Sequence, residues 1–160
     1  MSQGVDDMPI TTGINHVAFL TDDLDALIDF YTSVFDAELL ADLREGSLRH
    51  AMIDIGGHAA LHAFQVPDTA AATSFGGIFE RGHLDHIALD VADEQTFELV
   101  RRRLVERAAS DGTVTDFGRV RSVSFVDPDG WEGEIALWQD GPILTFDERI
   151  QEPYVAPMRS

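Results

Sequence analysis

Cysteine is absent from this chain of 160 residues, and so is lysine, because all 11 basic residues are arginine. Without cysteine the chain forms neither disulfides nor thiolate metal sites, so a bound metal would have nitrogen and oxygen ligands. No apolar run approaches the length that spans a bilayer. The first ten residues contain neither a basic region nor an apolar core, so we expect a cytoplasmic location.

Positive charge is also scarce, and the formal net charge is -18. Such a surface repels phosphate backbones, which argues against a nucleic acid as partner. The acidity is typical of a soluble, self-repelling surface. Apolar residues make up 44% of the chain, which is enough for the core of one compact domain or two small intertwined modules. We therefore expect a small-molecule substrate as partner, and neither a nucleic acid nor a membrane.

Two segments of the chain share one pattern, and 70 residues separate their first histidines, His16 and His86. Each histidine begins an alternating apolar run, which predicts a strand. In the first run, the alternation places His16, Ala18 and Leu20 on one face. An acidic pair and a run with helical periodicity follow each strand. The chain therefore repeats itself.

A helix is predicted in each copy from apolar residues at helical spacing, namely Leu24, Leu27, Ile28, Tyr31 and Phe35, and then Phe97, Val100 and Leu104. Asp22 or Asp23 is a plausible cap for the first helix, and Asp93 for the second. Gly112 is a plausible end for the second helix. Turn signals stand before the last strand of each copy, at Gly56–Gly57 and at residues 127–130.

Three short strands are predicted after each helix, near residues 37–43, 48–55 and 59–66, and near 114–117, 121–126 and 133–138. The order is therefore βαβββ twice, which predicts an α+β fold. We expect a single domain and its flanking parts with these bounds: domain 12–138, modules 12–66 and 83–138, inter-module loop 67–82, and an irregular tail 139–160.

Four side chains occupy matching places in the two modules. His16 and His86 lie in the first strands, while His62 and Glu134 lie in the last strands, 46 and 48 residues further on. If the modules pair about a pseudo-twofold axis, the four side chains can converge. Imidazole and carboxylate ligands suit a divalent metal ion such as Fe, Mn, Ni, Co or Zn. A charged Glu134 in an apolar strand is costly unless it is paired or metal-bound, which favours a ligand role.

Other polar and aromatic residues have a less specific pattern. We expect the remaining histidines, His50, His58 and His83, at the surface or behind the ligands. Asp85 or Asp90 can orient a ligand imidazole, although a solvated face accounts for both. The candidates for substrate contacts are Arg121, Phe75 and Trp131; an exposed strand position accounts equally well for the arginine, and ordinary packing for the aromatic residues.

Five pieces of sequence together resemble the vicinal oxygen chelate superfamily, and they are Asn15–Ala18, Phe30–Tyr31, Leu61–Gln65, Asp85–Ala88 and Ser124–Gly130 with Glu134 four residues later. This superfamily contains glyoxalase I, methylmalonyl-CoA epimerase, extradiol dioxygenases, and fosfomycin and bleomycin resistance proteins. The resemblance implies two βαβββ modules that form an open, cup-shaped, mixed and antiparallel sheet with flanking helices around a divalent metal ion, often in a homodimer.

The resemblance leaves three activities open. The first is a metal-dependent, glyoxalase-like isomerase, epimerase or lyase, whose substrate chelates through vicinal oxygens and reacts through a metal-stabilised enolate. In that branch all four positions hold the metal, with Glu or Gln where this chain has His62, and Glu134 or His62 would move the proton. The second is an Fe(II)-dependent extradiol-type dioxygenase that uses His16, His86 and Glu134. The third is a non-catalytic binding protein for a small molecule such as an antibiotic.

Two observations rank these activities. Extradiol enzymes use a further His and a Tyr near the site, and the strand segment 122–125 has neither, which disfavours ring cleavage. The non-catalytic relatives lack the ligands, whereas this chain has a candidate at all four positions. The sequence therefore favours the isomerase, epimerase or lyase.

Overall fold

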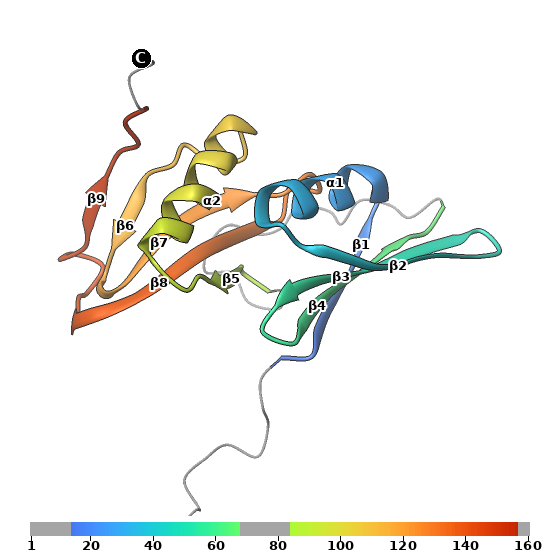
Figure 1. Ribbon diagram of the computed structural model, residues 1–160, viewed down its shortest axis with the longest axis horizontal. Helices are drawn as coiled ribbons and strands as arrows, with labels where there is room; N and C mark the ends of the chain where they lie inside the picture. The colour runs from blue at the N-terminus through green and yellow to red at the C-terminus, as the bar shows by residue number, and fades with distance from the viewer. Residues whose placement is uncertain (1–13, 68–83, 157–160) are drawn as a thin grey trace, which may run out of the picture. The chain divides into compact units, whose positions relative to one another are not determined.

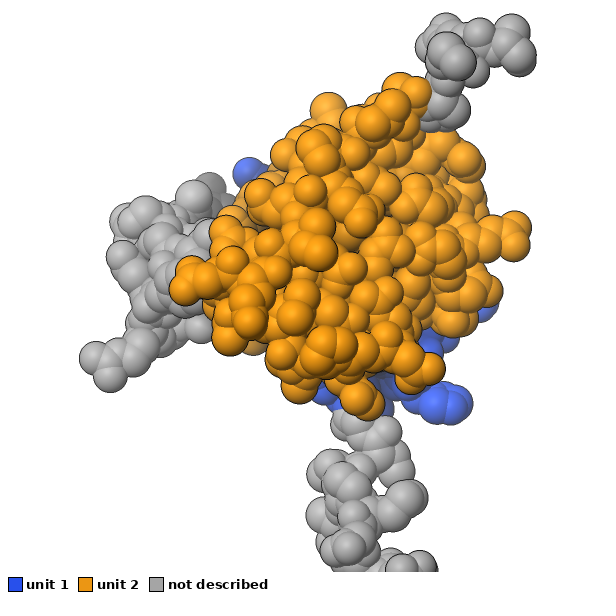
Figure 2. All heavy atoms as spheres, turned by 90° about the vertical axis from the view of Figure 1, so that its left-hand side faces the viewer, with its two compact units in different colours: residues 1–32, 36–67 blue, residues 33–35, 68–160 orange. Residues whose placement is uncertain are grey.

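The computed structural model describes residues 14–67 and 84–156 (Figure 1). The chain divides into two compact units, which are coloured separately in Figure 2. The first unit comprises residues 1–32 and 36–67, and the second comprises residues 33–35 and 68–160. The predicted inter-module loop therefore lies, apart from Pro67, outside the described residues.

The first unit contains a four-stranded sheet and a helix. Its elements are β1 (His16–Thr21), α1 (Leu24–Phe35, whose last three residues are assigned to the second unit), β2 (Glu38–Glu45), β3 (Leu48–Gly56) and β4 (Ala59–Gln65). The strand order is β1-β4-β3-β2. The pair β1–β4 is parallel, and the other neighbours are antiparallel. The predicted βαβββ order is confirmed.

The second unit repeats this arrangement and adds one strand. Its elements are β5 (Ile87–Asp90), α2 (Glu94–Glu106), β6 (Val114–Asp116), β7 (Gly118–Val126), β8 (Glu132–Ile143) and β9 (Ile150–Glu152). The strand order is β5-β8-β7-β6-β9, with β5 and β8 parallel. The predicted α+β fold with two βαβββ modules and mixed sheets is confirmed. Neither helix in the described residues is long and apolar enough to cross a membrane.

Acidic caps begin both helices. The carboxylate of Asp23 accepts from the Ala26 N–H at 3.0 Å, and that of Asp93 accepts from the Thr96 N–H at 2.7 Å. These bonds satisfy N–H groups that have no partner within the helix, so both predicted caps are confirmed.

The predicted end of the second helix is wrong. Helix α2 ends at Glu106, and Ala108 takes the left-handed conformation there with φ 54°. Gly112 lies after the helix, also with positive φ, and it has a different constraint. A Cβ at Gly112 would lie 2.6 Å from the Val105 side chain and 2.8 Å from Tyr154. Close packing therefore explains this glycine.

The two predicted turns have different outcomes. In the β3–β4 hairpin, Gly57 and His58 both have positive φ, 59° and 65°, as in a type I′ turn. The tight turn is therefore Gly57–His58, one residue later than predicted. The turn before β8 is confirmed, because Asp127 Oδ1 accepts from the N–H groups of Asp129 and Trp131 at 3.0 and 2.8 Å.

Each sheet buries alternate residues and leaves the other face more exposed. In the first unit, Ile53 and Leu61 are fully buried, together with Leu24 and Leu27 of α1. Figure 1 shows α1 along one side of its sheet. In the second unit the fully buried residues include Phe97 and Leu104 of α2 and Val123 and Ile135 of the sheet. The period of two in the strands therefore separates a core face from an open face.

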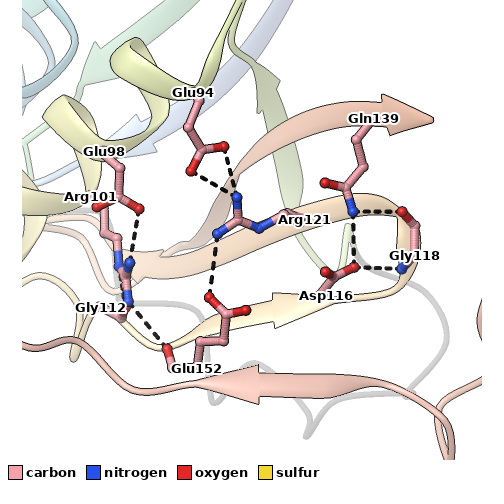
Figure 3. A network of polar contacts seen from close by, with 9 residues as sticks. All are labelled: Glu94, Glu98, Arg101, Gly112, Asp116, Gly118, Arg121, Gln139 and Glu152. Atoms are coloured by element: carbon pink, nitrogen blue, oxygen red, sulfur yellow. Dashed lines mark hydrogen bonds and ion pairs between the residues drawn. The ribbon is translucent and has the colours of Figure 1, made fainter. Parts of the chain in front are cut away.

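The tail predicted to be irregular is partly ordered as strand. Strand β8 continues to Ile143, and β9 pairs antiparallel with β6. Arg101 holds the tail in place, because its guanidinium donates to the Glu152 carbonyl at 3.2 Å (Figure 3). The guanidinium also lies over the Tyr154 ring. Backbone pairing and the buried Arg101 explain why part of the tail is ordered, although its prolines indicated an irregular segment.

We predict that Ile135→Ala lowers the free energy of unfolding by about 3 kcal/mol, because it leaves a cavity in a fully buried site. The matched control is Ile150→Ala, which removes the same atoms from a side chain that is 55% exposed. Urea unfolding followed by circular dichroism measures both. Equal losses in the two variants would contradict the assignment of the core face.

Candidate functional site

Strand pairing in the first unit brings two of the predicted ligands together. Ala18 of β1 is paired with His62 of β4, and His16 lies two residues before Ala18. Because side chains alternate along a strand, His16 and His62 lie on the same face. Their ring centroids are 5.9 Å apart. This is the open face, since His16, Ala18 and Leu20 are exposed while the opposite face carries buried Leu61.

The second unit repeats this register. Ala88 of β5 is paired with Glu134 of β8, and His86 lies two residues before Ala88. The Nε2 atom of His86 lies 3.8 Å from Oε2 of Glu134. The same strand pairing thus places His beside His in one unit and His beside Glu in the other.

A polar side chain orients the first imidazole of each unit. His16 Nδ1 lies 2.8 Å from Oδ1 of Asn15, and His86 Nδ1 lies 2.8 Å from Oδ2 of Asp85. Both oxygens are acceptors, so Nδ1 of each ring is the donor in this contact and Nε2 is not engaged by it. Metal-binding histidines usually have such an acceptor on the other ring nitrogen.

These contacts extend what the sequence predicts. Asp85, for which a solvated face also accounted, does orient His86. The contact of Asn15 with His16 was not predicted. The available signal was its position, since Asn15 and Asp85 both stand directly before the first histidine of their module.

His62 lies in a more enclosed environment. Its Nε2 is 3.0 Å from Nδ1 of His50 in β3, and its ring centroid is 4.1 Å from that of Phe64. Burial, together with the neighbouring His50 and His16, lowers the pKa of His62 from its ordinary value. The ring is therefore neutral near pH 7 and keeps one lone pair. His50, expected at the surface or behind the ligands, lies directly against this predicted ligand.

Glu134 lies on the open face of the second sheet, with 25% of its side chain exposed. The hydroxyl of Ser124, its partner on β7, donates to Oε1 at 3.4 Å. Ser124 alternates with Val123 and Phe125, which are buried on the opposite face. The carboxylate thus faces the same side as His86.

Arg121 lies on the other face of β7. Its Nη1 donates to both carboxylate oxygens of Glu94 at 2.7 and 2.8 Å, and its Nη2 lies 3.5 Å from Glu152 (Figure 3). The guanidinium also lies over the ring of Phe97, 5.3 Å from its centroid. The paired residue Leu137 is buried on this same face. Arg121 therefore joins α2 to β9 and does not share the face of Glu134.

Of the other two candidates for substrate contacts, only Trp131 lies within the described residues. Trp131 lies in the turn before β8, where its backbone exchanges hydrogen bonds with Asp127 at 2.8 and 3.0 Å. Its role toward a substrate stays a prediction. Phe75 and His83 lie outside the described residues.

The four predicted ligands are divided between the units, two in each. Within residues 14–67 and 84–156, no three His, Asp or Glu side chains are grouped closely enough to hold a metal ion. The structure therefore has two pairs of candidate metal-binding side chains in equivalent positions. Together they are three imidazoles and one carboxylate.

A family model matches residues 13–135 of the chain, and it describes the Glyoxalase/Bleomycin resistance protein/Dioxygenase superfamily. The match begins before β1 and ends within β8, so it includes at least part of every element of the two βαβββ modules. The chain belongs to this superfamily, as its resemblance to the vicinal oxygen chelate proteins implied.

Solved structures have the same fold at low sequence identity. A glyoxalase/bleomycin resistance protein/dioxygenase domain from Frankia sp. EAN1pec is 21% identical with TM-score 0.67, and the match covers 82% of this chain and 96% of that one. A lactoylglutathione lyase from Agrobacterium tumefaciens is 23% identical with TM-score 0.55, covering 81% and 96%. The fosfomycin resistance protein FosX from Mesorhizobium loti is 21% identical with TM-score 0.54, covering 79% and 91%.

We predict that Arg121→Met lowers the free energy of unfolding by about 1 kcal/mol, because it removes ion pairs whose carboxylates are more than half exposed. The methionine keeps an apolar contact for Phe97. The NMR shifts of the His86 ring should not change, because Arg121 lies on the opposite face. A change at His86 without a change in stability would contradict this placement.

Proposed function

We propose that the chain is a metal-dependent enzyme whose divalent metal ion is held by His16, His62, His86 and Glu134. The proposal rests on the contacts that the ring nitrogens of the three imidazoles make. Each has one ring nitrogen engaged by a neighbouring side chain, Asn15, His50 or Asp85, which leaves the other ring nitrogen to bind the metal. Ligating histidines in metal sites are held in this way.

The donor set fits a first-row divalent ion. Three imidazoles and one carboxylate suit Fe, Mn, Co, Ni or Zn, and the absence of cysteine removes thiolate alternatives. The lowered pKa of His62, caused by burial and by its neighbours His50 and His16, keeps this ring available as a neutral ligand. Family membership supports the proposal, because the superfamily includes glyoxalases and dioxygenases.

We further propose that the reaction is an isomerisation, epimerisation or lyase reaction of a small substrate with two adjacent oxygens, such as a hydroxy-carbonyl compound. The bound metal would supply Lewis acidity toward the substrate oxygens. Glu134 or His62 would move the proton. Both are suited to this step, since Glu134 is a carboxylate hydrogen-bonded to Ser124 and His62 is a neutral imidazole. On β7, Ser122 and Ser124 lie on the same face of the sheet as Glu134 of β8.

Metal binding tests the ligand set. We predict that the chain, purified without chelator, binds about one equivalent of a divalent first-row metal, and that His86→Ala or Glu134→Ala weakens binding more than about tenfold, because each removes a ligand and not merely its support. Elemental analysis and titration calorimetry with Zn²⁺ measure this. His58→Ala is the matched control, since His58 lies in the β3–β4 turn. Unchanged affinity in both ligand variants would refute the proposed set.

The class of reaction is tested separately. We predict that the metal-loaded protein exchanges the hydrogen beside the carbonyl of a hydroxy-carbonyl substrate with deuterium from the solvent, and that Glu134→Gln or His62→Gln reduces the exchange rate more than about 100-fold, within the range of general acid–base catalysis. NMR follows the exchange. Oxygen uptake with catechols and no exchange would favour the dioxygenase instead.

A further inference from the structure

We infer that His50 is a positioning residue that turns His62 so that it offers Nδ1, and not Nε2, to the metal. The inference rests on the proposed function and adds a residue and an atom to it. His16 and His86 have Nδ1 engaged and offer Nε2, whereas the contact between His50 and His62 uses Nε2 of His62.

The position of His50 is well defined by its neighbours. On β3 it stands opposite Phe64 of β4, and the two rings are stacked, with centroids 5.5 Å apart and an interplanar angle of 17°. Only 16% of its side chain is exposed. His62 contacts the same aromatic ring from its own strand. Phe64 thus fixes both imidazoles, and their nitrogens meet at 3.0 Å.

The direction of this hydrogen bond follows from the proposed ligand role of His62. The contact at 3.0 Å joins one nitrogen of each ring, so one ring donates and the other accepts. A metal ligand needs a lone pair, and Nε2 of His62 is engaged by His50, so the lone pair of His62 has to lie on Nδ1. His62 then donates through its Nε2–H, and Nδ1 of His50 accepts.

In the resulting set of ligands, His62 binds the metal through Nδ1, whereas His16 and His86 bind it through Nε2. A histidine that binds metal through one nitrogen normally donates from the other, and here the acceptor is a second imidazole. His50 would thus act through His62 without touching the metal. Its removal should change the tautomer of His62 in the metal-free protein, which a purely structural contribution to the fold would not do.

The first experiment measures tautomers in the full chain without metal. Long-range ¹H–¹⁵N NMR assigns the hydrogen of each histidine ring, and we expect it on Nε2 of His62 but on Nδ1 of His16 and His86. His50→Phe keeps the stack on Phe64 and removes the acceptor, so the Nε2–H preference of His62 should be lost. His50→Asn offers an amide oxygen near the position of Nδ1 and should restore it. His58→Phe is the control in the turn.

The second experiment adds Zn²⁺. We expect the ¹⁵N signal of His62 Nδ1 to shift on binding while its Nε2–H persists, and His50→Phe to weaken Zn²⁺ binding about 10- to 100-fold with recovery in His50→Asn. A hydrogen on Nδ1 of His62 in the unmodified chain, or an unchanged tautomer in His50→Phe, would overturn the role of His50. Failure of the unmodified chain to bind Zn²⁺ or another divalent ion would instead refute the proposed function, and the tautomer measurement would still decide the orientation.

Discussion

The parallel pairing of the first and last strands of each module determines where the four proposed ligands lie. Parallel neighbours need a long crossover connection, and here α1 with two strands connects β1 to β4, as α2 with two strands connects β5 to β8. The pairing sets the register Ala18–His62 and Ala88–Glu134. A shift by one residue would send one proposed ligand of each pair to the buried face.

Much of the fold could be predicted because the sequence repeats with little change. The alternation that begins at His16 and at His86 identifies two equivalent strands, and Asp23 and Asp93 cap equivalent helices. Equivalent places in two copies of one pattern also identify His62 and Glu134, since a last strand that pairs with the first carries its side chains on the same face. Local periodicity and the likeness of the two modules are enough to place these residues on equivalent strands.

The contacts that support these residues could not be predicted in the same way. The distance between His50 and His62 depends on the register of β3 against β4, which a hairpin turn sets, and this turn lies one residue later than the glycine pair suggested. Whether Arg121 faces Glu134 or α2 likewise depends on which residues of β7 point to each face of the sheet. The order of the tail depends on Arg101, a helix residue whose partners lie far along the chain.

The proposed metal site requires that both register-matched pairs donate to one cation. X-ray absorption spectroscopy of the protein loaded with one equivalent of Zn²⁺ tests this most directly, because imidazole ligands give a characteristic outer-shell scattering and their number can be fitted. We expect a shell of about three imidazole nitrogens and one carboxylate, with distances of about 2.0–2.2 Å. A shell with only one imidazole, or with oxygen ligands alone, would contradict it.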